Sequence, residues 1–191
     1  MKFFIAVVFL SIIFFSCSTN TSQQPDGESK DSSVYYPVHE YFLNEVKDVD
    51  STPFYIYKLS EKNGKKDSAG ISKQAFNELA KQFLSINTNE AAFKKNYQET
   101  VFEDNSTNSI TLTYLTRDKS LPIQNIVVLL SNDGQKVKRI FITTSYSHND
   151  SVINEKSGWK TGEEFYINRS IDKAGNPVLT ETNTIVWNKK E

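Results

Sequence analysis

The stretch from residue 109 to residue 146, SITLTYLTRDKSLPIQNIVVLLSNDGQKVKRIFITTSY, decides the fold because one strand pattern follows another along it. Residues 109–116 alternate apolar side chains with threonines, which is typical of a strand with one buried face. Residues 123–131 are almost continuously apolar, as expected of a central strand. Asn-Asp-Gly at 132–134 predicts a tight turn, after which residues 136–146 alternate again. The stretch therefore predicts consecutive antiparallel strands.

The flanking sequence predicts more strands of the same kind. EEFYINRSI (163–171) and VLTETNTIVW (178–187) are strand-like runs, and the turn residues DKAGNP between them predict a second hairpin. TPFYIYKLS (52–60) is rich in aromatic and β-branched residues and is followed by the turn signal Asn63-Gly64. About five or six strands are expected in all.

Two amphipathic helices are expected before the main run of strands. The first presents one apolar face, and Pro37 suits its first turn; the face is formed by Val38, Phe42, Val46 and Val49. The second has Ser72 as a helix N-cap and a continuous apolar stripe; the stripe is formed by Ala75, Phe76, Leu79, Ala80 and Phe83. The predicted fold class is α+β: an antiparallel meander sheet of about five or six strands with two N-terminal helices packed on one face.

The first twenty residues, MKFFIAVVFLSIIFFSCSTN, have the pattern of a secretory signal peptide. Lys2 precedes an apolar run over residues 3–15, which is shorter than the roughly 20 residues of a membrane-spanning helix. The alternative is a buried core helix. The run is apolar on every side and leads into a polar segment, which favours the signal peptide.

The end of this run resembles the lipobox of bacterial lipoproteins, in a form similar to those of Bacteroidota. Phe14, Phe15 and Ser16 precede Cys17, the only cysteine of the chain. The resemblance implies cleavage between Ser16 and Cys17 and attachment of acyl chains, such as palmitate, at Cys17. It therefore implies a membrane anchor in the cell outer membrane, facing the periplasm because Ser18 and its neighbours are uncharged. In an organism with one membrane, the anchor would be on the outer face of the plasma membrane.

Three segments follow from these patterns. Residues 1–16 are expected to be the signal peptide, and residues 17–33 the lipidated cysteine and a flexible tether. Residues 18–33 contain no large apolar residue, so they cannot bury enough surface to become ordered. Residues 34–191 have the length of a single domain, which is expected to be the α+β domain.

Composition and motifs exclude several functions. The 22 basic and 23 acidic residues balance, which argues against nucleic-acid binding. The chain has no Gly-x-Ser-x-Gly nucleophile motif and no glycine-rich phosphate loop. His39 and His148 are its only histidines, and their separation is unlike that of metal ligands. We therefore expect no catalytic residues, no metal site and no cofactor.

The function expected from these observations is that of a lipid-anchored cell-envelope protein. Its domain would be non-enzymatic and would bind an envelope protein or an apolar ligand. Two alternatives remain: a membrane-anchored hydrolase using carboxylates from separate strands, and a structural subunit of an envelope complex. Converging acidic groups in a cleft would favour the hydrolase, whereas a large exposed apolar patch would favour the subunit.

One candidate binding face lies opposite the isoleucines of residues 136–146. Arg139 and Phe141 alternate with Ile140 and Ile142, so they point to the other side of the strand. Arginine and aromatic residues are frequent anchors in interfaces. The alternative is that the sheet curls and buries Phe141 in a small second cluster.

Three tripeptides resemble the Asp-Ser/Thr-apolar acceptor motif for O-glycosylation in Bacteroides. Their serine positions are Ser51, Ser68 and Ser151, and all three are expected in loops. The alternative is chance, because Asp-Ser pairs are ordinary turn residues.

Overall fold

The computed structural model describes residues 35–188 of the chain. The expected signal peptide, Cys17 and the tether lie outside the described residues. Within residues 35–188 there are three helices and nine strands. In chain order they are α1 (Val38–Ser51), β1 (Tyr57–Lys62), β2 (Lys65–Gly70), α2 (Lys73–Leu84), α3 (Ala91–Asn96), β3 (Tyr97–Asp104), β4 (Ser109–Thr116), β5 (Ile123–Ser131), β6 (Val137–His148), β7 (Ser151–Lys160), β8 (Glu164–Lys173) and β9 (Leu179–Val186).

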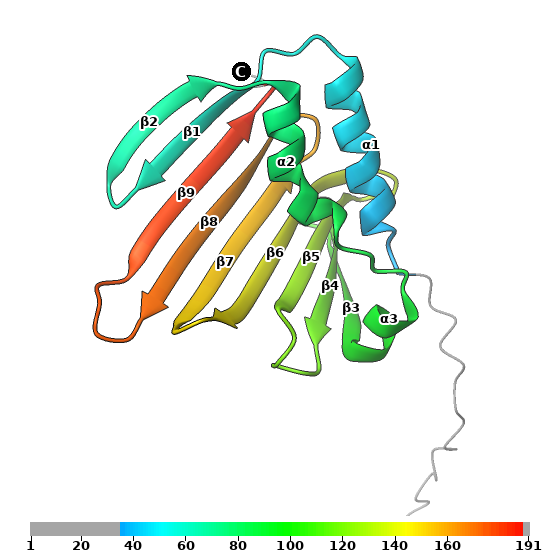
Figure 1. The fold of residues 1–191 in the computed structure, drawn as a ribbon. Coiled ribbons are helices and arrows are strands. Elements are labelled where there is room, and N and C mark those ends of the chain that lie inside the picture. Colours follow the sequence, from blue (N-terminus) through cyan, green and yellow to red (C-terminus); the bar gives the residue numbers. More distant parts are fainter. Residues whose placement is uncertain (1–34, 189–191) are drawn as a thin grey trace, which may run out of the picture. The chain divides into compact units, whose positions relative to one another are not determined.

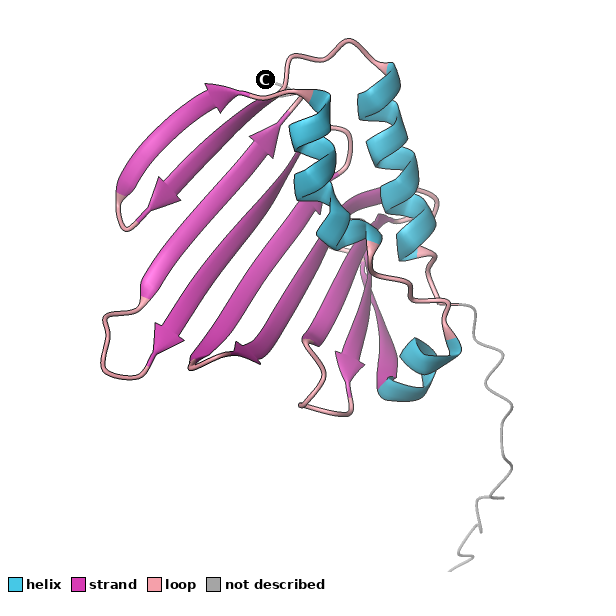
Figure 2. Ribbon diagram, viewed as in Figure 1, coloured by secondary structure: helices cyan, strands magenta, loops and turns pink. Residues whose placement is uncertain are grey.

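All nine strands belong to one antiparallel sheet (Figures 1 and 2). Strands β3 to β9 form a meander in which each strand pairs with the next. β1 then pairs with β9, and β2 forms the edge beyond it, so the order is β2-β1-β9-β8-β7-β6-β5-β4-β3. The hairpin β1–β2 thus extends the meander on the side of the last strand.

The predicted fold was wrong in the number of strands and in the place of the helices. The sheet has nine strands instead of five or six, and the described residues contain three helices instead of two. The β1–β2 hairpin lies between α1 and α2 in the chain, so the two helices do not form an N-terminal block. The strands that the sequence did not reveal are β2, β3 and β7.

Each missed strand lacks a regular apolar pattern. All six residues of β2 are exposed, and in β3 only Tyr97 is buried. In β7 the side that faces the helices carries Glu155 and Ser157 before Trp159. Hydrogen bonding to neighbouring strands, which does not depend on side chains, holds these segments in the sheet.

The apolar faces of both predicted helices are confirmed. The buried residues of α1 are those expected: Val38, Phe42, Val46 and Val49. α2 buries Phe76, Ala80 and Phe83, and the Ser72 side chain accepts a hydrogen bond from the Ala75 amide at 3.2 Å. Figure 1 shows α1 and α2 on the same side of the sheet, with the lower ends of β7 to β9 beyond them. We call this side of the sheet the helix-covered face.

The core is an aromatic cluster around Trp159, which is 1% exposed. Its indole packs against five rings from both helices, from β8 and from the segment after β9: Phe42, Phe76, Phe83, Phe165 and Trp187. Its Nε1 donates a hydrogen bond to Glu45 on α1 at 3.0 Å. The same Glu45 oxygen accepts a hydrogen bond from the Gly162 amide at 2.7 Å. Glu45 therefore fixes α1 to the β7–β8 turn.

Cross-strand pairing arranges the helix-covered face in rows. The row beneath the helices is Ile140, Trp159, Phe165 and Ile185. Four residues further along β6, on the same face, comes the charged row: Thr144, Glu155, Arg169 and Glu181. Two residues beyond that comes the apolar row: Tyr146, Ile153, Ile171 and Leu179. Since side chains alternate between faces, all three rows point to the same side of the sheet.

The described residues, 35–188, belong to one compact unit. The buried aromatic and aliphatic residues described above all belong to it. A unit with a core of its own is expected to fold when it is produced without residues 1–33. None of the helices within residues 35–188 is both long and apolar enough to cross a membrane.

Candidate ligand groove

A hollow of about 420 Å³ lies on the helix-covered face where α2 ends. Three parts of the chain line it: the end of α2 with the residues after it, the β4–β5 loop, and strands β6 to β8. The lining residues are Gln82, Phe83, Ser85, Ile86, Pro122, Ile123, Ile142, Thr144, Tyr146, Glu155, Ser157 and Arg169. We call this hollow the α2 groove. Its volume is within the range of small-molecule sites.

The position of α2 defines one wall of the groove. Phe83 holds the end of the helix against the sheet through its contacts with Phe42, Trp159 and Phe165. The Leu84 carbonyl lies 2.8 Å from Nδ1 of His39, which joins the end of α2 to α1. The wall of the groove is therefore built on packed helices.

Two buried polar atoms belong to side chains that line the groove, and neither has a hydrogen-bond partner. They are Nε2 of Gln82 and Oγ1 of Thr144. Leaving such an atom unpaired typically costs about 1–3 kcal/mol, and most buried polar atoms in proteins are paired. The apolar residues Ile86, Pro122 and Ile123 line the same hollow. The α2 groove thus combines an apolar surface with two polar groups that a ligand oxygen could satisfy.

A partly buried ion pair, Glu155–Arg169, also lines the groove. Nε and Nη2 of Arg169 donate to Oε2 of Glu155 at 2.9 and 2.8 Å. The Glu155 side chain is 9% exposed and that of Arg169 is 37% exposed. Burial disfavours the charged form of Arg169, but hydrogen bonding to Glu155 and the charges of Glu155, Tyr146 and Glu181 outweigh it and raise the Arg169 pKa. Arg169 is therefore a fixed cation held by Glu155.

The charged row brings two carboxylates from separate strands next to one arginine. Glu155 and Glu181 lie on separate strands, as the hydrolase alternative requires, but Arg169 lies between them in the charged row. No group of three or more His, Cys, Asp or Glu side chains within residues 35–188 could hold a metal ion.

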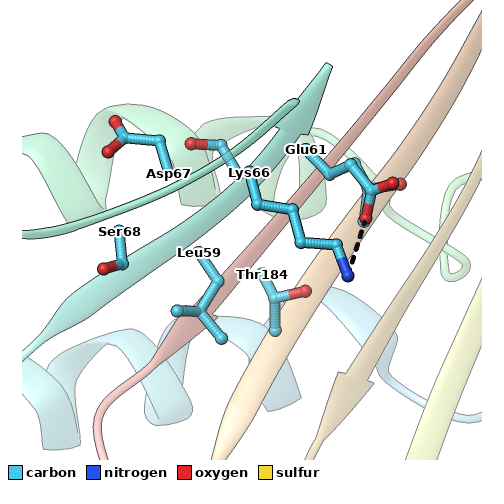
Figure 3. A pocket seen from close by; sticks show the side chains of 8 residues that line it. Leu59, Glu61, Lys66, Asp67, Ser68 and Thr184 are labelled. Atoms are coloured by element: carbon cyan, nitrogen blue, oxygen red, sulfur yellow. Dashed lines mark ion pairs between the residues drawn. The ribbon is translucent and has the colours of Figure 1, made fainter. Parts of the chain in front are cut away.

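A second hollow of about 500 Å³ lies at the edge formed by β1, β2 and β9 (Figure 3). Figure 3 shows Glu61 and Lys66 turned toward each other. Nζ of Lys66 lies 3.9 Å from Oε2 of Glu61. Both side chains are largely exposed, and such surface pairs contribute little free energy. None of the residues lining this hollow carries an unpaired buried polar atom. The α2 groove is therefore the stronger candidate.

Arg139 and Phe141 lie on the opposite face of the sheet, away from the α2 groove. Arg139 is exposed and Phe141 is half-buried. Phe141 pairs with Gly158, and the ring of Tyr166 covers this glycine so closely that a β-carbon there would lie 2.5 Å from it. Phe141 and Tyr166 thus lie on either side of Gly158 on this face, outside the core around Trp159.

The other candidate residues are scattered. His39 contacts the end of α2, whereas His148 is exposed at the end of β6. The three candidate glycosylation sites were predicted in loops, but each serine lies in a helix or a strand. Ser51 ends α1, Ser68 lies within β2 and Ser151 begins β7.

Four residues of the groove were not predicted from the sequence: Gln82, Thr144, Glu155 and Arg169. Thr144 gave a signal, because it follows Ile140 and Ile142 on one face of its strand. The sequence signal for Gln82 was weaker: it is a polar residue next to the apolar stripe of α2. The Glu155–Arg169 pair gave none, because β7 was not predicted.

The sequence matches no protein-family model, and no curated protein matches it. Among solved structures, the S-type phycobiliprotein lyase CPES from Guillardia theta is similar at a TM-score of 0.28 and 15% identity. The similarity covers 82% of this chain and 96% of that chain. A TM-score this low supports no conclusion about fold or function.

Proposed function

We propose that the domain binds a small, largely apolar organic molecule in the α2 groove without changing it chemically. The observation that carries this proposal is the pair of unpartnered buried atoms, Gln82 Nε2 and Thr144 Oγ1, on side chains that line the hollow together with apolar residues. A ligand oxygen that hydrogen-bonds to them would remove their desolvation penalty. Ile86, Pro122 and Ile123 would cover its apolar part.

Substitution of the two polar groups should separate binding from folding. In Gln82→Met and Thr144→Val, an apolar group of similar shape replaces the unpaired atom, so stability should stay the same or rise. Affinity for Nile red, a neutral apolar dye with a carbonyl oxygen, should fall about three- to tenfold in each variant. Dye fluorescence titration and thermal unfolding measure the two effects.

Gln74→Met is the matched control, because Gln74 is exposed on the same helix and does not line the groove. It should leave dye affinity unchanged. Equal affinity of wild type, Gln82→Met and Thr144→Val would contradict the proposed site.

We also propose that the protein is anchored by acyl chains on Cys17 and acts in the cell envelope, in the outer membrane facing the periplasm. The support is the resemblance of residues 14–17 to a lipobox. Two or more acyl chains suffice for stable attachment.

Replacement of Cys17 tests this anchor. Cys17→Ala should abolish lipidation and either release the domain from the membrane fraction or leave the uncleaved precursor. Membrane fractionation and intact-mass spectrometry report these outcomes, with Ser18→Ala as a control that should remain lipidated. An unmodified Cys17 in the native protein would contradict the anchor.

A further inference from the structure

We infer that the ligand is a single-chain molecule with an uncharged, oxygen-bearing head, whose unbranched alkyl chain extends from the α2 groove along the apolar row. This inference rests on the proposed function, because the head is assigned to Gln82 and Thr144. It adds the chemical class of the ligand and a second part of the site.

The apolar row is continuous with the α2 groove. Tyr146 lines the groove and pairs with Ile153 on β7. Ile153 pairs with Ile171 on β8, which pairs with Leu179 on β9. These four side chains therefore lie side by side on the helix-covered face, and they lead away from the groove across four strands.

The row ends in a hollow of its own. A space of about 370 Å³ is lined by Ile171 and Leu179 together with the β8–β9 loop, including Asn176 and Pro177. Tyr146 is 38% exposed and Leu179 is 46% exposed, although both face the side of the sheet that holds the core. A ligand chain over the row would remove this apolar surface from water.

The dimensions of the row suit one chain of medium length. Four adjacent strands span three spacings of about 4.8 Å, or about 14 Å in all. An extended peptide advances about 3.5 Å per three backbone bonds, so an extended alkyl chain needs about twelve bonds for this distance. A decyl or dodecyl chain matches that length.

The borders of the row limit its width to one chain. On one side lies the charged row with Glu155, Arg169 and Glu181. On the other side lie the hairpin residues His148, Ser151 and Lys173. Polar neighbours on both sides disfavour a branched or fused-ring group lying over the row, because it would cover charged groups without pairing them. A ring system such as that of Nile red is expected to occupy the α2 groove alone.

The charges near the groove favour an uncharged head. Arg169 is already bound by Glu155, and Glu181 is its other neighbour in the charged row. Glu181 in turn lies opposite Lys62 on β1, so the two carboxylates and two cations of this row balance. The row therefore supplies no net positive charge for a carboxylate head, and placing a charge in the groove without a partner costs free energy. Gln82 Nε2 and Thr144 Oγ1 can instead donate to a hydroxyl or carbonyl oxygen.

The test is displacement of Nile red from residues 34–191 by primary alcohols from hexan-1-ol to dodecan-1-ol, each below its solubility limit. Each added methylene should improve affinity about two- to fourfold, with the gain ending near decyl or dodecyl. Ile171→Ser and Leu179→Ser should weaken dodecan-1-ol binding about tenfold or more while leaving hexan-1-ol binding unchanged. Dodecanoate should bind more weakly than dodecan-1-ol.

Val152→Ser is the matched control. Val152 is an exposed apolar residue of β7, like those of the apolar row, but it lies on the opposite face. Val152→Ser should change neither the affinity for dodecan-1-ol nor the affinity for hexan-1-ol. If alcohol affinity does not depend on chain length, or if dodecanoate binds more tightly than dodecan-1-ol, the inference is wrong. The proposed function would still stand in that case, provided that Gln82→Met weakens dye binding. Failure of wild type to bind the dye and every alcohol would overturn both.

Discussion

Trp159→Ala should lower the free energy of unfolding by about 3–5 kcal/mol, the range for removal of a large buried aromatic side chain. Trp159 is packed against five aromatic rings that come from four separate parts of the chain. Its removal would leave a cavity between the helices and the sheet that these elements cannot close by small shifts. Urea unfolding followed by far-UV circular dichroism measures the loss.

Trp159→Phe is the matched variant. It keeps an aromatic ring but removes the indole N–H that donates to Glu45. The loss of one hydrogen bond to a charged group should contribute about 1.5–3 kcal/mol. A Trp159→Ala variant less than 1 kcal/mol below wild type would show that the aromatic cluster does not hold the helices to the sheet.

Arg169→Ala should lower the free energy of unfolding by about 2–3 kcal/mol at neutral pH. The Glu155 side chain would stay buried and lose both hydrogen bonds from the guanidinium. Breaking a fully buried pair by removing one partner costs about 3–5 kcal/mol, and the partial exposure of Arg169 reduces that figure. Chemical denaturation of wild type and variant gives the difference.

The double variant Glu155→Gln/Arg169→Met separates loss of the pair from loss of packing. It removes both charges and keeps most of the volume, so it should regain much of the stability lost in Arg169→Ala. If the double variant is less stable than Arg169→Ala, the penalty does not come from an unpaired Glu155.

The parts of the fold that the sequence predicted are those with strong apolar periodicity. The four buried positions of α1 repeat at helical spacing, and the N-cap Ser72 marks the start of α2. The hairpins β5–β6 and β8–β9 combine apolar strands with clear turn residues, and both are present. In these segments local preference and tertiary packing agree.

Two of the strands that were not predicted have little apolar burial, so their sequences do not show a strand pattern. β2 and β3 are the two edges of the sheet, where one side of a strand has no neighbour and burial is slight. Polar edge strands are a common protection against unwanted pairing, and they weaken the sequence signal at the same time.

The candidate site could not be derived from the sequence for a related reason. Glu155 and Arg169 meet only through the register between β7 and β8, in which they are directly opposed. That register depends on β7, whose helix-facing side is partly polar because it carries Glu155 and Ser157. The residues that give the groove its chemistry are thus those that obscure the strand pattern.

The pairing of β1 with β9 has a consequence for how the chain acquires its structure. Tyr57 lies opposite Val186, so this junction connects the beginning of the domain to its end. Contacts between residues so distant in sequence slow folding, because a long loop must close before they form. The β1–β2 hairpin has no strand to join until β9 is in place. During synthesis, the final strand therefore determines when the first hairpin can enter the sheet, and a chain that stops before residue 179 would leave that hairpin detached.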